Sequence, residues 1–244
     1  MTSGGGPTTA IEDYLRHIYL AQEHSASDLV SMGRIAELLS VVPGTATAMV
    51  KRLADSNYLI YEPYTGVRLT EGGRRLALKV VRRHRLVESL LVDTLGLDWS
   101  EVHDEADRLE HAVSDKLLDR IDAFLGYPSV DPHGDPIPNA DGVLREAKLI
   151  SLTECRTGIQ VRVARVLDQD ENFLRFIEQH NLKPGAKLAI EQHDPIAAAI
   201  TVRPQRHASL TMGLTAAAKL LVEESEPHYG PLPPVVTQPP SAAD

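Results

Sequence analysis

Cysteine is almost absent from this chain, whose 244 residues include a single one, Cys155. One thiol cannot form an internal disulfide, and it excludes both a cysteine-rich zinc site and an iron–sulfur cluster held by the chain's own cysteines. Long hydrophobic runs are also missing, and residues 1–10 contain neither Lys nor Arg nor an apolar core. We therefore expect no membrane helix, no secretory signal and a cytoplasmic location.

Positive charge is scarce overall, but its distribution is uneven. The formal net charge of −9 divides into +1 over residues 1–95, −8 over residues 96–145 and −2 over the remainder. An acidic total disfavours indiscriminate binding to nucleic acid, yet it leaves the first segment free to bind DNA. The crowded acidic residues of the middle segment repel one another, so they need solvent or a bound cation to offset the repulsion.

Signatures of catalysis are missing as well. The sequence has no phosphate-binding Walker loop, no Gly-x-Gly-x-x-Gly fingerprint and no Ser-His-Asp order. Residues 107–111 resemble the zinc-protease motif His-x-x-Glu-His, but Asp107 stands in place of the first histidine and removes a nitrogen ligand. We predict that the protein is not an enzyme and has no small-molecule substrate.

Apolar periodicity in the first third of the chain predicts a helix-turn-helix. A helix is expected from residue 9 to about residue 24, and a short second helix follows the capping residue Ser31. Pro43 suits the first turn of a third helix, which should run to about residue 57. β-branched and aromatic residues flank the Thr65-Gly66 pair, so residues 58–70 are predicted to form a β-hairpin.

The rest of the chain changes from helical to strand patterns. Thr70 should cap a helix that ends at Gly96, and Ser100 should cap one further helix that ends near residue 125. Proline and glycine make residues 126–145 a linker without regular structure. Strands are predicted at residues 158–166, 187–192, 197–203 and 207–210, with a helix at 172–181, which together indicate a small β-barrel. The Pro-rich residues from 226 onward are expected to be disordered.

The predicted helix-turn-helix suggests DNA contacts, because the second helix of this motif enters the major groove and its first residues meet base edges. Here those residues are small or able to contact thymine methyl groups: Pro43, Gly44, Thr45, Thr47 and Ala48. Lys51 and Arg52 suit phosphates, and Arg68 would lie on the hairpin as a wing. A basic run follows at Arg74, Arg75, Lys79, Arg82, Arg83 and Arg85. An ordinary helical hairpin that does not bind DNA is the alternative.

Metal-ligand residue types recur on the helix predicted after Ser100. Helical spacing places four of them on one face: His103, Asp107, Glu110 and His111. His84 and Glu88 form an i, i+4 pair on the preceding helix, and Asp13 on the first helix could add an oxygen. A solvated acidic face is the alternative. The remaining histidines considered lack such neighbours and are expected on the surface or in loops: His24, His133, His180, His193, His207 and His228.

Residues 11–19, 35–53, 82–91 and 102–111 together resemble the diphtheria toxin repressor family of metal-dependent repressors, most closely its manganese-responsive members. The stretch Asp131-Pro-His-Gly-Asp-Pro-Ile-Pro138 also resembles the linker of that family. The resemblance is close over about residues 9–140 and looser over about residues 148–222. It implies a transcription regulator that acts as a dimer.

The resemblance also implies a mainly α chain with three domains. Residues 9–73 would form a winged helix-turn-helix DNA-binding domain, and residues 74–126 the helices for metal binding and dimerisation. After a Pro-rich linker at residues 127–147, a carboxy-terminal SH3-like small β-barrel would occupy residues 148–225. Flexible or disordered tails are expected at residues 1–8 and 226–244.

By the same resemblance, the primary metal site falls on Asp13, Asp107, Glu110 and His111. The ancillary site falls on His84, Glu88 and His103, and further ligands are expected near Gln169 and Asn172, beside Asp168, Asp170 and Glu171. Iron-type repressors carry Met and Cys where this chain has Asp13 and Asp107. Manganese regulators with a paired-ion site carry Glu where this chain has Arg16.

These observations predict a Mn²⁺-activated repressor that binds a palindromic, double-stranded operator as a homodimer and controls manganese homeostasis genes. Carboxylates and one imidazole are hard ligands of the kind that suit Mn²⁺. A repressor that responds to Fe²⁺ is the first alternative. The second, from a different class, is a cytoplasmic metal-binding or metal-delivery module that does not bind DNA.

Overall fold

The structure is a computed structural model that describes residues 8–23, 25, 27–145 and 147–224. The chain divides into two compact units, the first formed by residues 1–148 and 165–179 and the second by residues 149–164 and 180–244. Of the tails expected at residues 1–8 and 226–244, residues 1–7 and 226–244 lie outside the described residues, as do His24 and His228. Within the described ranges, no helix is both long and apolar enough to cross a membrane.

The first unit begins with the predicted helix-turn-helix and hairpin. Helices α1 (Thr9–Glu23), α2 (Met32–Leu38) and α3 (Pro43–Asp55) precede the antiparallel strands β1 (Leu59–Glu62) and β2 (Gly66–Leu69). The side chain of Ser31 accepts a hydrogen bond from the backbone N–H of Arg34, which satisfies an exposed donor at the start of α2. Apolar side chains from all five elements form one core.

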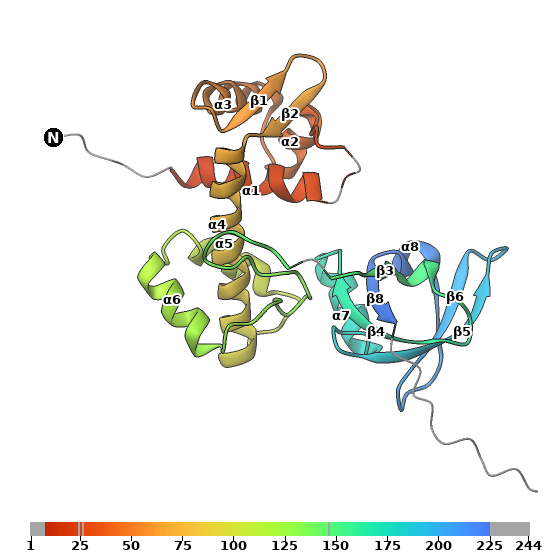
Figure 1. The fold of residues 1–244 in the computed structure, drawn as a ribbon. Coiled ribbons are helices and arrows are strands. Elements are labelled where there is room, and N and C mark those ends of the chain that lie inside the picture. Colours follow the sequence, from red (N-terminus) through yellow and green to blue (C-terminus); the bar gives the residue numbers. More distant parts are fainter. Residues whose placement is uncertain (1–7, 24, 26, 146, 225–244) are drawn as a thin grey trace, which may run out of the picture. The chain divides into compact units, whose positions relative to one another are not determined.

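Helix α4 (Glu71–Ser89) links this core to the rest of the first unit. The side chain of Thr70 caps its start, as predicted, by accepting a hydrogen bond from Gly73 N–H. A Cβ atom at Gly73 would lie 2.1 Å from the carbonyl oxygen of Tyr58, so only glycine permits this close approach of helix and hairpin. The helix continues as a π-helical turn (Leu90–Thr94). In Figure 1, α4 runs from the winged-helix core to the region of α5 and α6.

The single helix predicted after Ser100 is wrong, because two helices are present. Helix α5 (Val102–Leu109) ends before Glu110, and α6 (Asp115–Phe124) starts after Ser114, whose side chain accepts a hydrogen bond from Leu117 N–H. Ser100 does not cap α5, since its hydroxyl bonds instead to the carboxylate of Asp98. Ser114 accounts for the break between α5 and α6, because a serine favours the capping position before a helix over a position in a helix interior.

The Pro-rich stretch 126–145 has no helix or regular strand, but it is not a loose spacer. Asp131, His133, Asp135 and Ile137 are buried. The carboxylate oxygen Oδ1 of Asp131 accepts hydrogen bonds from the backbone N–H groups of His133 and Asp135, which folds the segment on itself. Helix α7 (Glu171–Gln179) completes the first unit.

The second unit is built around a six-stranded sheet with the order β3-β8-β4-β5-β6-β7. The strands are β3 (Ile150–Ser151), β4 (Gln160–Val166), β5 (Lys187–Asp194), β6 (Ala199–Pro204), β7 (Leu210–Gly213) and β8 (Leu220–Glu224). A short 3₁₀ turn (Leu152–Glu154) and helix α8 (Leu214–Ala217) connect them. Alternate residues of β4, such as Val161 and Val163, are fully buried, which explains the alternating sequence pattern.

The expectation of a mainly α chain therefore holds only for the first unit. The three helices of the helix-turn-helix and the helices of the metal-binding region agree with it, but the carboxy-terminal part is a β-sheet domain. Taken as a whole, the fold is mixed α and β.

Candidate metal centre and DNA-binding surface

The first cluster of metal-ligand side chains joins α1 to the turn after α5. Nε2 of His111 lies 2.9 Å from Oδ1 of Asp13 and 3.3 Å from Oε1 of Glu110. Asp13, Glu110 and His111 each offer one ligand atom, and these atoms lie within 4.8 Å of one another. Oε1 of Glu110 is buried and has no hydrogen-bond partner among the described residues. This orphaned carboxylate oxygen fits a cation ligand, because a buried polar atom without a partner is costly.

Arg16, which stands where manganese regulators with a paired-ion site carry Glu, lies beside this cluster. Its guanidinium contacts Oδ1 of Asp107 at 2.7 Å and Oε2 of Glu110 at 3.1 Å, and its side chain is only 3% exposed. The same group lies 2.6 Å from Nδ1 of His84. The sequence had suggested that the acidic residues repel one another unless a cation is bound. In the fold, Arg16 supplies a permanent positive charge to Asp107 and Glu110.

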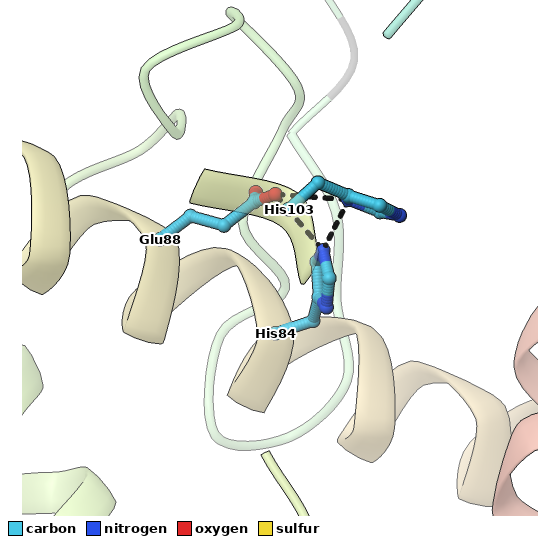
Figure 2. A group of neighbouring side chains, drawn as sticks. All are labelled: His84, Glu88 and His103. Atoms are coloured by element: carbon cyan, nitrogen blue, oxygen red, sulfur yellow. Dashed lines mark hydrogen bonds and ion pairs between the residues drawn. The ribbon is translucent and has the colours of Figure 1, made fainter. Parts of the chain in front are cut away.

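The second cluster joins α4 to α5 and is drawn in Figure 2. Nε2 of His84 lies 2.9 Å from Oε1 of Glu88 and 3.0 Å from Nδ1 of His103. The same oxygen of Glu88 lies 3.2 Å from Nδ1 of His103. The i, i+4 spacing places His84 and Glu88 on one face of α4, and the packing of α5 brings His103 to them. Two imidazoles and one carboxylate can hold a divalent ion.

Charge coupling inside these clusters shifts several pKa values. Burial disfavours a charged His84, but the charge of Glu88 and hydrogen bonds to Asp107, Glu110 and Glu88 outweigh it and raise the pKa of His84 well above its usual range. Burial likewise opposes ionisation of Glu88, yet the charge of His84 and a hydrogen bond with His103 hold the pKa of Glu88 well below its usual range. Both shifts favour the charged forms of the two side chains.

Asp107 contacts the second cluster and is not part of the group formed by Asp13, Glu110 and His111. Oδ1 of Asp107 lies 3.2 Å from Nδ1 of His84, and Oδ2 lies 3.9 Å from Nε2 of His103. Partial burial would raise its pKa, but the hydrogen bond with His84 and the charge of Arg16 outweigh burial and lower the pKa of Asp107. Asp107, His84 and Glu110 also form a three-donor group of their own. The structure thus brings all seven predicted metal residues into one connected region.

The second carboxylate oxygen of Glu88 faces another group of residues, which the sequence did not indicate. This oxygen, Oε2, lies 4.0 Å from Nδ1 of His133, and Asp131 joins these two residues in a fully buried three-donor group. Oε2 of Glu88, Nδ1 of His133 and Oδ2 of Asp131 have no hydrogen-bond partner among the described residues. Burial, with the charges of Asp135 and Glu88, raises the pKa of Asp131 well above its usual range.

His133 was expected on the surface or in a loop. It lies outside the helices and strands, but it is not on the surface. Its side chain is fully buried, it donates a hydrogen bond from Nε2 to the carbonyl oxygen of Trp99, and it stacks on the Trp99 ring. The motif Asp-Pro-His-Gly-Asp could have indicated the turn, because an Asp side chain commonly accepts a hydrogen bond from the backbone N–H two residues on, but it gives no signal for burial.

A cavity of about 200 Å³ lies against the second cluster, within the first unit. His84, Glu88, His103 and Asp131 line it, together with Gln169. The side-chain amide of Gln169 donates a hydrogen bond to Asp135. Of the further ligands expected from the sequence, Gln169 thus reaches the site, whereas Asn172, Asp168, Asp170 and Glu171 are not among the described residues that line the cavity.

The predicted DNA-contacting residues lie on an open surface. Pro43 begins α3, and Pro43, Gly44, Thr45 and Ala48 are exposed, while Thr47 is partly exposed. Lys51, Arg52 and Arg68 are exposed as well. A Cβ atom at Gly44 would meet nothing within 4 Å, so no intramolecular packing requires glycine there. Open space at the start of this helix leaves room for a duplex.

Only half of the basic run after the hairpin remains available to DNA. Arg74, Arg75 and Lys79 are exposed. Each of the other three binds a partner within the protein. Arg82 donates to Asp122 and to the carbonyl oxygen of Pro138. Arg83 binds the carboxylates of Glu12 and Asp115. Arg85 binds the carboxylates of Glu23, Asp131 and Asp135.

Comparison with known proteins finds three matching families along the chain. Residues 8–67 match the iron dependent repressor N-terminal DNA binding domain, and residues 70–139 the iron dependent repressor metal binding and dimerisation domain. Residues 150–224 match the FeoA domain. The iron-dependent repressor IdeR of Mycobacterium leprae is 33% identical over 225 residues, which cover 87% of this chain and 96% of that protein.

The chain belongs to the diphtheria toxin repressor family. The diphtheria toxin repressor of Corynebacterium diphtheriae is 40% identical over 130 residues, which cover 53% of this chain and 57% of that protein. A solved structure described as a manganese-dependent transcriptional repressor in complex with manganese is similar with a TM-score of 0.81 and 41% identity, covering 88% of this chain and all of that one.

Membership of the diphtheria toxin repressor family makes this protein a metal-dependent transcriptional repressor and not an enzyme. It also explains why the metal-ligand side chains gather where α1 meets the helices that follow the winged motif. Relatives described as iron-dependent and as manganese-dependent both occur, so family membership establishes a divalent metal and leaves its identity to the chemistry of the site.

Proposed function

We propose that this protein is a Mn²⁺-activated repressor that binds a palindromic operator as a homodimer and controls manganese homeostasis genes in the cytoplasm. The observation that carries the proposal is the convergence of Asp13, Glu110 and His111 around a buried, unpartnered carboxylate oxygen. Asp13 belongs to α1 of the winged-helix core, whereas Glu110 and His111 follow α5. A cation at this point would join the two parts of the first unit.

The donor chemistry supports manganese. The primary cluster offers carboxylate oxygens and one imidazole but no sulfur, and hard oxygen ligands suit Mn²⁺. Fe²⁺ is the second candidate, since relatives described as iron-dependent are similar to this chain. The guanidinium of Arg16 lies between the two clusters, which supports two separate single-ion sites in place of one paired-ion site.

Exposed apolar side chains support a homodimer. Leu109 on α5, and Leu117 and Phe124 on α6, are 40%, 50% and 70% exposed. They lie in the part of the chain that matches the metal-binding and dimerisation domain of the family. A two-fold dimer must place its two recognition helices about 34–36 Å apart, or a multiple of that distance, to enter successive major grooves.

The test is DNA binding titrated with Mn²⁺, Fe²⁺ and Zn²⁺ in parallel, with Fe²⁺ kept anaerobic. Duplexes would first be selected from a randomised pool by protein loaded separately with each ion, and then titrated by fluorescence anisotropy. We expect a twofold-symmetric sequence to emerge, and we expect Mn²⁺ to activate binding to it. Activation by Fe²⁺ alone would favour the iron-responsive alternative. Tight metal binding without any selected duplex would favour the metal-delivery module.

Ligand exchange provides a second test of metal choice. The double variant Asp13→Met and Asp107→Cys adds two soft ligands and removes two carboxylates. We expect its DNA binding to respond more strongly to Fe²⁺ and later metals, relative to Mn²⁺, than that of the wild type. An unchanged ranking of metals in the same titration would contradict ligand hardness as the determinant.

A further inference from the structure

The imidazole of His111 is held on both sides by consecutive residues of α1. Its Nε2 lies 2.9 Å from Asp13, in the primary cluster, and its Nδ1 lies 2.7 Å from Oε2 of Glu12. Glu12 is buried and does not belong to any of the groups of metal-ligand atoms in the described part of the chain. Its carboxylate therefore faces the side of the ring that points away from the cluster.

This arrangement leaves Nε2 of His111 facing the candidate ligands and Nδ1 facing Glu12. A carboxylate only accepts hydrogen bonds, so Nδ1 of His111, when it carries a proton, donates it to Glu12. Nε2 is then the nitrogen that faces Asp13 and the unpartnered oxygen of Glu110. Histidines that bind metals almost always donate their other N–H to a carboxylate or carbonyl, which fixes the tautomer and the orientation of the ring.

Glu12 is itself held in place by Arg83 of α4. Nη1 of Arg83 lies 3.2 Å from Oε1 of Glu12, while Nη2 lies 3.1 Å from Asp115 at the start of α6. The side chains of Glu12 and Arg83 are 11% and 16% exposed, whereas that of Asp115 is 80% exposed. Of the two carboxylates that bind Arg83, only Glu12 also reaches His111.

We propose that Glu12 is a positioning residue of the primary metal site, which acts through His111 and does not itself bind the ion. The proposal rests on the metal dependence proposed above. Because Glu12 and Asp13 are consecutive, one turn of α1 supplies both a ligand and the group that orients a second ligand. Seating of α1 and binding of metal are thereby coupled at a single imidazole ring.

The test compares Mn²⁺ affinity, measured by calorimetry on the full chain, in four variants. Glu12→Ala removes the acceptor, and Glu12→Gln keeps an oxygen of similar reach. Asp115→Asn is the matched control, since it removes the other partner of Arg83 without touching His111. His111→Ala removes a proposed ligand and shows how far Mn²⁺ affinity falls when the site itself is lost. Circular dichroism of each metal-free variant shows whether it is folded.

We expect Glu12→Ala to weaken Mn²⁺ affinity about 10- to 100-fold, the range found for residues that orient metal ligands. Glu12→Gln should recover a substantial part of that loss, and Asp115→Asn should bind like the wild type. If Glu12→Ala does not fold, the comparison of Glu12→Gln with Asp115→Asn decides, and a weakened Glu12→Gln against an unchanged Asp115→Asn supports the proposal.

Two results would overturn the inference. If His111→Ala lost the site while both Glu12 variants bound Mn²⁺ as tightly as Asp115→Asn, Glu12 would have no positioning role and the proposed function would stand. If the wild-type chain bound neither Mn²⁺ nor Fe²⁺, the proposed function would fall and this inference with it.

Discussion

At the scale of single residues, Arg16 decides how the metal-free protein tolerates its acidic cluster. Asp107 and Glu110 each contact the guanidinium of Arg16, which is almost fully buried. A buried charge is stable only while its partners remain, because removing one partner leaves the other without compensation. The carboxylates that would bind metal therefore also hold Arg16 in the absence of metal.

This double role predicts the sign of a stability change. The variant Glu110→Ala should lower the free energy of unfolding of the metal-free protein by about 3 kcal/mol, because it breaks a buried ion pair. The exposed pair of Arg34 and Glu37 provides the control, and Glu37→Ala should cost less than about 1 kcal/mol. Chemical denaturation in the presence of a chelator measures both. A metal-free Glu110→Ala protein more stable than the wild type would mean that carboxylate repulsion dominates.

The His84–Glu88 pair predicts a pH dependence. The pKa of His84 is raised from 6.5, so its contribution to stability is present below about pH 6.5 and is lost as pH rises through the raised value. The pKa of Glu88 is lowered from 4.5, so its contribution is present above about pH 4.5 and is lost as pH falls. In a chelator, the pair should stabilise most between these values.

The measurement is the free energy of unfolding of the metal-free protein from pH 5 to pH 9. Wild-type stability should decline at the alkaline end, and the variant His84→Gln should show less of that decline. A parallel pH dependence in the two proteins would exclude His84 as its source.

At the scale of elements, the proposed metal site makes α1 the helix whose position should depend most directly on metal. It contributes Asp13 to the primary cluster and Glu12 to the contact with His111, while its apolar face packs in the winged-helix core with α2, α3 and the hairpin. A cation that binds Asp13 together with Glu110 would therefore restrict a helix that shares its core with the recognition helix α3. We expect binding to select the arrangement that is competent for DNA.

Hydrogen exchange can detect this restriction. Adding Mn²⁺ should slow the exchange of backbone amides in α1 (Thr9–Glu23), because local opening of a helix becomes less favourable when one of its side chains binds an ion. The strands β5 and β6 of the second unit serve as the internal control and should change little. Equal protection of α1 and of these strands would indicate general stabilisation and not a specific effect on α1.

At the scale of the whole molecule, two binding events act on one dimer. We expect metal to bind where α1 meets the segment after α5, and DNA to contact the exposed start of α3. If metal favours the spacing of recognition helices that fits the operator, then operator must favour metal by the same factor, because binding free energies form a closed cycle.

Calorimetry measures this reciprocity. Mn²⁺ would be titrated into the full chain with and without the selected operator duplex, and DNA binding would be measured with and without Mn²⁺. We expect the two ratios of affinities to agree. Equal Mn²⁺ affinities with and without operator would show that the metal has only a structural role.

The sequence by itself determined the features that belong to one element. Helical spacing placed His84 beside Glu88 and His103 beside Asp107, Thr70 capped α4, and alternation identified β4. The family resemblance supplied Asp13 as a partner for residues about a hundred positions away. Such patterns succeed because they depend on backbone geometry that repeats within a helix or strand.

Only the tertiary structure decided which charges face inward. Arg16 binds carboxylates that lie 91 and 94 residues away in the sequence, and Glu12 meets His111 across 99 residues. Arg83, which had been grouped with a basic surface for DNA, binds Glu12 instead. Spacing along the chain shows which face of a helix a side chain occupies, but the packing of other helices decides whether that face meets solvent, a partner charge or a metal ligand.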